Sequence, residues 1–265
     1  MARTVGDVST SPRPAVPQPD PGDEPATTPT EPGFGSGTLG RATAFVYWYM
    51  VVGALMNVGS LPAVLLLLLL GRSAGNVLLV PLCLVLYGPV LSAGLYALRD
   101  RTRSEGLTPA RSFLRGLRLG WADSLKAWTP PMVVLAVLAG SLANLGAAGV
   151  PLTYAGVLVV IGVLVVLWAL NALTIATFFS FRGRDVLRLA VFYIARQWRV
   201  TVGLLALVVV AIGVVWTTTE AVLWLFTVVW LGFLLGNARP LVADVARRFT
   251  VPQAVQQEDG GGTAA

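Results

Sequence analysis

The stretch YGPVLSAGLYALRDRTRSEG, residues 87–106, contains an abrupt change from apolar to basic sequence. Its first twelve residues carry no charge, and Arg99, Arg101 and Arg103 then follow within five positions. Arginine and lysine clustered directly after an apolar segment are typical of the cytoplasmic end of a transmembrane helix. The stretch therefore predicts a membrane-spanning segment that ends near residue 98.

The composition of the 265-residue chain also favours a membrane protein. Apolar residues make up 55% of the chain and charged residues only 12%, whereas a soluble globular domain carries about 25% charged residues. The net charge is +6, but the basic residues lie between apolar runs, so they predict orientation in a bilayer and not binding to nucleic acid. The chain has no histidine and one cysteine, Cys83. We therefore expect no internal disulfide, no Cys/His metal site and no bound cofactor.

The sequence divides into three parts. Residues 1–41 are rich in Pro, Ser, Thr, Gly and acid and predict a disordered cytoplasmic tail, and residues 250–265 predict a second one. Residues 42–249 predict an all-α membrane domain of about six transmembrane helices, because a span needs about 20 apolar residues. The predicted spans are Thr43–Leu70, Val77–Leu98, Trp128–Ala148, Tyr154–Phe181, Val200–Thr217 and Ala221–Leu235.

The distribution of basic residues predicts the orientation. In a six-span arrangement, eighteen of the nineteen Lys and Arg residues fall on one side, and only Arg72 falls on the other. Short loops rich in Lys and Arg stay cytoplasmic. We therefore expect a multi-pass protein of the cell (plasma) membrane with both termini in the cytoplasm. Glu220 is the only acid on the predicted outer side, where we expect it to reach water.

The two long cytoplasmic loops predict amphipathic helices at the membrane surface. In residues 99–127, Thr108 and Pro109 favour the start of a helix, and basic residues then alternate with an apolar stripe. Residues 182–199 have a similar but weaker pattern. These helices are candidates for docking a partner protein or anionic lipid, through Phe113, Arg115, Arg118, Trp121, Arg196 and Trp198.

Inside the predicted spans, the polar side chains of interest are Asn57, Asn144 and Asn171. They either join helices by hydrogen bonds or line a path for a solute, and the sequence alone leaves both open. No Gly-rich phosphate loop, pair of catalytic carboxylates or nucleophile–base motif is present. We therefore expect a protein without catalytic residues.

The segment PLCLVLYGPVLSAGLYALRDR, followed by ARSFLRGLRLGWADSLKAW, resembles the YesL-like family of bacterial integral membrane proteins, a domain of unknown function. The resemblance covers about residues 42–249, and Trp121-Ala122 departs from the Asn that many members carry near that position. Its supporting residues are Gly88, Pro89, Ala93, Leu95, Tyr96, Phe113 and Leu117. It implies an accessory role in carbohydrate uptake by sugar ABC transport systems. Some members carry a ferredoxin–NADP reductase label, but this sequence contains no flavin, nucleotide or iron–sulfur motif.

The sequence is therefore compatible with three functions. The first is a non-catalytic inner-membrane accessory factor that docks a sugar transporter subunit or anionic lipid through its cytoplasmic helices. The second is a self-contained transporter or channel for small solutes, which uses the asparagine-bearing spans. The third, an intramembrane enzyme, has the least support because the spans contain almost no ionisable groups.

Overall fold

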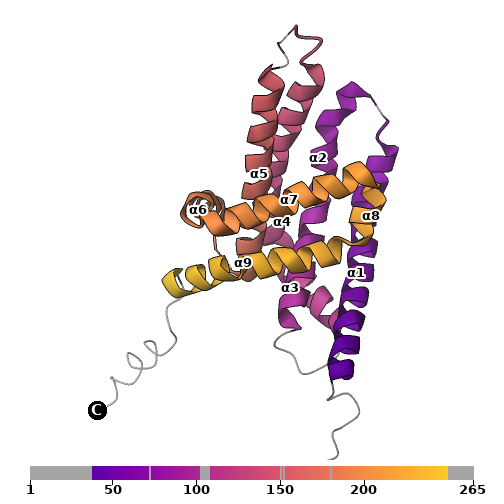
Figure 1. Ribbon diagram of the computed structural model, residues 1–265, viewed down its shortest axis with the longest axis vertical. Helices are drawn as coiled ribbons and strands as arrows, with labels where there is room; N and C mark the ends of the chain where they lie inside the picture. The colour runs from indigo at the N-terminus through magenta and orange to yellow at the C-terminus, as the bar shows by residue number, and fades with distance from the viewer. Residues whose placement is uncertain are drawn as a thin grey trace, which may run out of the picture. The chain divides into compact units, whose positions relative to one another are not determined.

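The computed structural model describes residues 38–71, 73–101, 108–149, 151, 153–179 and 181–249. These residues form helices and short connections and contain no strand (Figure 1). Most of the two predicted tails, 1–41 and 250–265, and also Arg72, lie outside the described residues. The helices are α1 (Thr38–Leu69), η1 (Ala74–Leu78), α2 (Leu79–Cys83), η2 (Leu84–Leu86), α3 (Tyr87–Asp100), α4 (Pro109–Asn144), α5 (Thr153–Phe178), α6 (Gly183–Arg196), α7 (Trp198–Thr217), α8 (Glu220–Leu225) and α9 (Thr227–Phe249).

Six helical segments of the described chain are long and apolar enough to cross a membrane. This confirms the predicted all-α architecture and its number of candidate spans. The segments are Ala42–Leu69, Gly75–Asp100, Pro109–Asn144, Thr153–Phe178, Trp198–Thr217 and Thr227–Arg248.

The second span is not a regular helix. It runs as η1, α2, η2 and α3 in sequence, with two short 3-10 segments before the regular helix begins at Tyr87. Pro81 and Pro89 lie within this stretch. Each proline lacks the N–H group that a regular helix needs for its backbone ladder, so interruptions are expected there.

The third span differs from the prediction. The expected surface helix near residues 108–127 and the expected span from Trp128 form one continuous helix, α4, of 36 residues. Pro130 and Pro131 lie inside it without ending it, and the Thr129 hydroxyl donates a hydrogen bond of 2.7 Å to the Leu125 carbonyl beside them. Such side-chain bonds help helices in membranes to tolerate proline. The separate surface helix is therefore corrected to an extension of this span.

The length of α4 explains why a single helix can be basic at one end and apolar at the other. At 1.5 Å per residue, its 36 residues extend about 54 Å. The hydrocarbon core of a bilayer is about 30 Å thick. The excess length lets the arginine-bearing turns near Pro109 extend past the hydrocarbon while the apolar turns lie inside it.

Close packing of α3 against α4 forms the centre of the core, and two glycines allow it. A side chain at Gly88 would meet Trp128 at 2.6 Å, and one at Gly116 would meet Tyr96 at 2.8 Å. Both distances are shorter than real side-chain contacts. Small residues of this kind let helices approach closely in membranes, where packing and not water drives association.

Five of the eight tryptophans join different elements through the indole N–H. Trp48 on α1 donates to the Ala97 carbonyl at 3.2 Å, and Trp128 on α4 donates to the Leu84 carbonyl at 3.0 Å in the interrupted span. An indole N–H without an acceptor is unfavourable in hydrocarbon. The remaining pairs are Trp168 with Leu187, Trp224 with Ser60 and Trp230 with Leu207.

The last two long helices run across the direction of α1, α4 and α5. Figure 1 shows α7 and α9 lying side by side in this crosswise direction, joined by the short helix α8. Transmembrane helices tilt from the membrane normal by about 20° on average and up to about 40°. No single membrane normal is close to both groups of helices, so α7 and α9 lie at a steep tilt in any orientation that keeps α1, α4 and α5 near the normal (Figure 1).

Candidate functional site

The exposed face of α4 carries three of the six residues predicted to dock a partner. Arg115, Arg118 and Trp121 are all exposed, and Arg111 lies on the same side one turn earlier. Their spacing of three or four residues places them along one face of the helix. We call Arg111, Arg115 and Arg118 the α4 basic stripe. Trp121 and Leu114 flank it as exposed apolar side chains.

Phe113 is not part of this surface. Its side chain is only 2% exposed and belongs to the main core cluster, together with Trp128 and Val90. Because α4 packs along α3 from its first turn, the face that carries Phe113 turns inward. The prediction that Phe113 docks a partner is therefore wrong, and its role is in packing.

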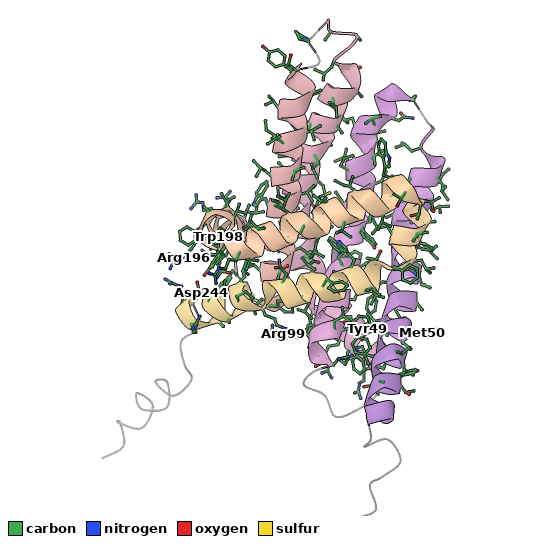
Figure 2. The ribbon with its side chains drawn as sticks, in the orientation of Figure 1. Tyr49, Met50, Arg99, Arg196, Trp198 and Asp244 are labelled. Carbon is green, nitrogen blue, oxygen red and sulfur yellow. The ribbon has the colours of Figure 1, made fainter. Side chains whose placement is uncertain are left out.

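Arg196 and Trp198 lie at the junction between α6 and α7 (Figure 2). Trp198 is 64% exposed. The Arg196 guanidinium carbon lies 5.7 Å from the centre of the Phe192 ring, which is also exposed. This junction thus presents a cation and two aromatic rings to the surroundings, which is the composition that interfacial surfaces of membrane proteins favour.

A buried tyrosine holds α6 against α9 beside that junction. The Tyr193 hydroxyl donates a hydrogen bond of 2.9 Å to Asp244 Oδ2, and Arg248 Nε donates to the same oxygen at 3.0 Å. Burial of the ring, followed by the hydrogen bond to Asp244 and the nearby negative charge, raises the pKa of Tyr193 to about 12. The phenol therefore stays neutral at physiological pH, as a structural donor.

The arginines that end the second span pack on aromatic rings of two other helices. The Arg99 guanidinium lies 4.4 Å from the centre of the Phe178 ring on α5, and the Arg101 guanidinium lies 4.3 Å from the Phe45 ring on α1. Cation–π contacts of this kind contribute about 0.5–2 kcal/mol. Sequence reasoning placed these arginines at the membrane surface but missed the rings, because the partners are far away in the chain.

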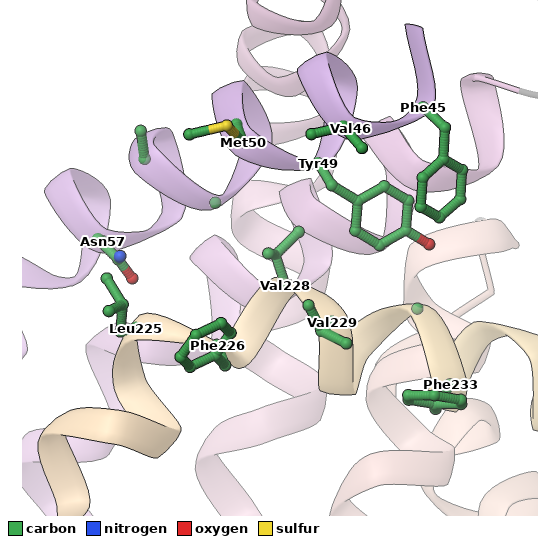
Figure 3. A pocket seen from close by; sticks show the side chains of 13 residues that line it. Phe45, Val46, Tyr49, Met50, Asn57, Leu225, Phe226, Val228, Val229 and Phe233 are labelled. Carbon is green, nitrogen blue, oxygen red and sulfur yellow. The ribbon is translucent and has the colours of Figure 1, made fainter. Parts of the chain in front are cut away.

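An apolar groove lies between α1 and the α8–α9 segment (Figure 3). We call it the α1–α9 groove, and its volume is about 670 Å³. Asn57 is the most polar side chain in it apart from the Tyr49 hydroxyl. The lining residues are Phe45, Val46, Tyr49, Met50, Gly53, Ala54, Asn57, Leu225, Phe226, Val228, Val229, Gly232 and Phe233.

The three asparagines predicted inside the spans lie on three different helices. Asn57 lines the α1–α9 groove. Asn144 is exposed at the end of α4, where its Nδ2 donates 2.7 Å to the Gly140 carbonyl of its own helix. Asn171 is 3% exposed in α5, and its Nδ2 has no acceptor among the described residues. The structure thus does not bring the three together.

Comparison with models of protein families, with curated proteins and with solved structures gave no match. Within the described ranges, no group of three Cys, Asp or Glu side chains lies close enough together to hold a metal ion. The class of protein that the fold defines is therefore a multi-helix protein with six candidate membrane spans.

Proposed function

We propose that the chain is a multi-pass protein of the cell membrane with cytoplasmic termini. The support is the position of the basic residues. The α4 basic stripe lies at the start of the third candidate span, and Arg99 and Arg101 lie at the end of the second. Charges at these span ends stay on the cytoplasmic side.

In this orientation, the protein acts as a non-catalytic accessory factor that docks another membrane component. The observation that supports this role is the α4 basic stripe, which leaves its three arginines exposed beside Trp121 and Leu114. Docking surfaces are enriched in arginine and aromatic residues, and the same chemistry attracts anionic lipid. The resemblance to YesL-like proteins directs the proposal to a subunit of a sugar ABC transport system.

Charge reversal on the stripe tests the docking role. Affinity purification of the tagged protein from gently solubilised membranes should recover a sugar permease subunit, and the double variant Arg115→Glu/Arg118→Glu should lose it while still inserting. The matched control is Arg184→Glu/Arg188→Glu, which makes the same charge change at exposed positions of α6. Equal recovery of the permease with all three proteins would refute docking through α4.

A self-contained transporter is the second candidate, and one observation favours it. Asn171 is a buried amide without an acceptor for its Nδ2 among the described residues, and polar groups of this kind inside membranes often serve function. Purified protein in liposomes should then move a solute, and Asn171→Leu should change the flux. A panel of sugars and ions that gives no flux would remove this alternative.

A further inference from the structure

The α1–α9 groove is open and apolar along two candidate membrane spans. Its α1 side belongs to the first candidate span, and much of its α9 side belongs to the last. Met50 is 70% exposed there, and Phe226 and Phe233 are also exposed on the opposite side. A groove of this composition fits a hydrocarbon chain, because burying apolar surface needs no polar partner.

The dimensions of the groove fit one acyl chain. Its α1 side extends from Phe45 to Asn57, which at 1.5 Å per residue is about 18 Å. One leaflet contributes about half of the hydrocarbon thickness of about 30 Å. The groove therefore has about the length of a lipid tail in a single leaflet.

One end of the groove carries a positive charge. The Arg101 guanidinium lies 4.3 Å from the centre of the Phe45 ring and 5.7 Å from that of Tyr49, and both rings line the groove. Arg101 directly follows the candidate span that ends at Asp100. The charge is thus at the membrane boundary, where lipid headgroups lie.

One nitrogen of the Arg101 guanidinium, Nη1, lacks an acceptor among the described residues. This nitrogen is also buried. A buried donor of a charged group without an acceptor is unfavourable. An anionic phosphate is the acceptor that an arginine fork binds best, since it takes two parallel hydrogen bonds.

We propose that the α1–α9 groove is a binding site for one anionic phospholipid, with an acyl chain along α1 where α9 crosses it and the headgroup phosphate bound by Arg101. The site is separate from the α4 basic stripe and does not depend on the docking function. Arg101 gives the site its preference for anionic lipid, and the apolar walls give it affinity for the chain. Gly53 and Gly232 let α1 and α9 approach each other at the groove, since a side chain at either would meet Val228 or Tyr49 within 3 Å.

Native mass spectrometry of the full-length protein tests this site. Detergent-purified protein is titrated with phosphatidylglycerol or with phosphatidylcholine of the same acyl chains, and retained lipid is counted. We expect one phosphatidylglycerol per chain, held about tenfold more tightly than phosphatidylcholine, because charge-assisted hydrogen bonds to arginine are strong. Equal retention of the two lipids by the unmodified protein would refute the proposal.

Variants of Arg101 and Ala54 distinguish binding of the headgroup from binding of the acyl chain. Arg101→Gln should lose the preference for phosphatidylglycerol, and Arg101→Lys should keep part of it. Ala54→Phe, which fills the groove from an exposed position of α1, should weaken the binding of both lipids. The controls are Arg184→Gln and Ala206→Phe, at exposed positions outside the groove, which should bind as the unmodified protein does.

Two further results would contradict the site. If Arg101→Gln folds and keeps the full preference for phosphatidylglycerol, the headgroup is bound elsewhere. If the spectrum shows a dimer without lipid, and Ala54→Phe dissociates it, a second copy of the chain covers the groove.

Discussion

The hydroxyl of Tyr193 on α6 donates a hydrogen bond of 2.9 Å to the carboxylate of Asp244 on α9. The two residues are 51 positions apart, and the ring of Tyr193 is 1% exposed. Arg248 also donates to Asp244, so the carboxylate has a partner from its own helix as well. The bond fixes α6 to the end of α9 and thereby fixes the α6–α7 junction that presents Arg196 and Trp198.

Removing the Tyr193 hydroxyl should loosen this joint. We expect Tyr193→Phe to lower the free energy of unfolding in detergent by about 1–2 kcal/mol at pH 7, since one buried hydrogen bond to a charged acceptor is lost. Thermal unfolding followed by circular dichroism measures the change. Tyr154→Phe, at an exposed position of α5, is the control and should unfold as the unmodified protein does.

The raised pKa of Tyr193 predicts a loss of stability in alkali. Its folded pKa of about 12 lies above the ordinary tyrosine pKa of about 10, so folding favours the protonated phenol. This contribution is complete below pH 10 and is lost as the pH rises toward 12. Between these values, the unfolding temperature of the unmodified protein should fall more steeply than that of Tyr193→Phe. Parallel curves for the two proteins would show that Tyr193 does not titrate in this range.

Substitution by alanine should destabilise the protein at glycines that lie in helix contacts, but not at glycines that face open space. An alanine methyl at Gly88 would lie 2.6 Å from Trp128 Cδ1 and 2.9 Å from its Cβ, so the helices must move apart. We expect Gly88→Ala to lower the free energy of unfolding by about 1–3 kcal/mol. Gly162→Ala, where nothing lies within 4 Å, should cause no loss, because alanine favours a helix by about 1 kcal/mol. Equal unfolding temperatures for the two variants would contradict the close approach of α3 and α4.

Single cysteines at the two ends of α4 test the orientation. Cys83 is the only cysteine, so Cys83→Ala gives a background without thiols. A membrane-impermeant maleimide should label Ala110→Cys only after the cells are opened and Ala147→Cys in intact cells, since Ala110 is exposed in the first turn of α4 and Ala147 is exposed in the turn just beyond its other end. Labelling of both from the same side would contradict a spanning α4.

The cysteine-free Cys83→Ala background also tests whether α7 and α9 cross the membrane. Thr218 is exposed in the turn between α7 and α8, and the six-span orientation places this turn outside. We therefore expect Thr218→Cys to label in intact cells, as Ala147→Cys does. Labelling only in opened cells would mean that α7 and α9 do not cross the membrane as separate spans.

The sequence predicts the helices better than it predicts their contacts. Apolar runs of about 20 residues identify the spans directly, because a bilayer sets their length. The continuity of α4 was missed because the basic residues 99–127 were assigned to a cytoplasmic loop that ends before Trp128, although a helix longer than the hydrocarbon thickness can carry basic turns beyond it. Inward-facing Phe113 was assigned to the surface because the helix near residues 108–127 was predicted to lie on the membrane, where its apolar side would face lipid.

The groove and its arginine depend on contacts between distant segments. Trp48 bonds to a carbonyl 49 residues away, and Arg101 stacks on a ring of α1. Neither pairing follows from the periodicity of a single helix. Periodicity predicts the face of the helix on which a residue lies, but not which residue of another helix it contacts. The α1–α9 groove likewise requires the register between the first helix and the last.

The buried amide of Asn171 gives a prediction that separates packing from function. A buried donor without an acceptor costs about 1–3 kcal/mol, and Asn171 Nδ2 has none among the described residues. Asn171→Leu should therefore raise the unfolding temperature of the empty protein in detergent. Thr174→Val is the control: Thr174 donates 2.8 Å to the Leu170 carbonyl of its own helix, so its loss should change stability little. A clear fall with Asn171→Leu would show instead that a bound water or solute satisfies the amide, which would favour the transporter alternative.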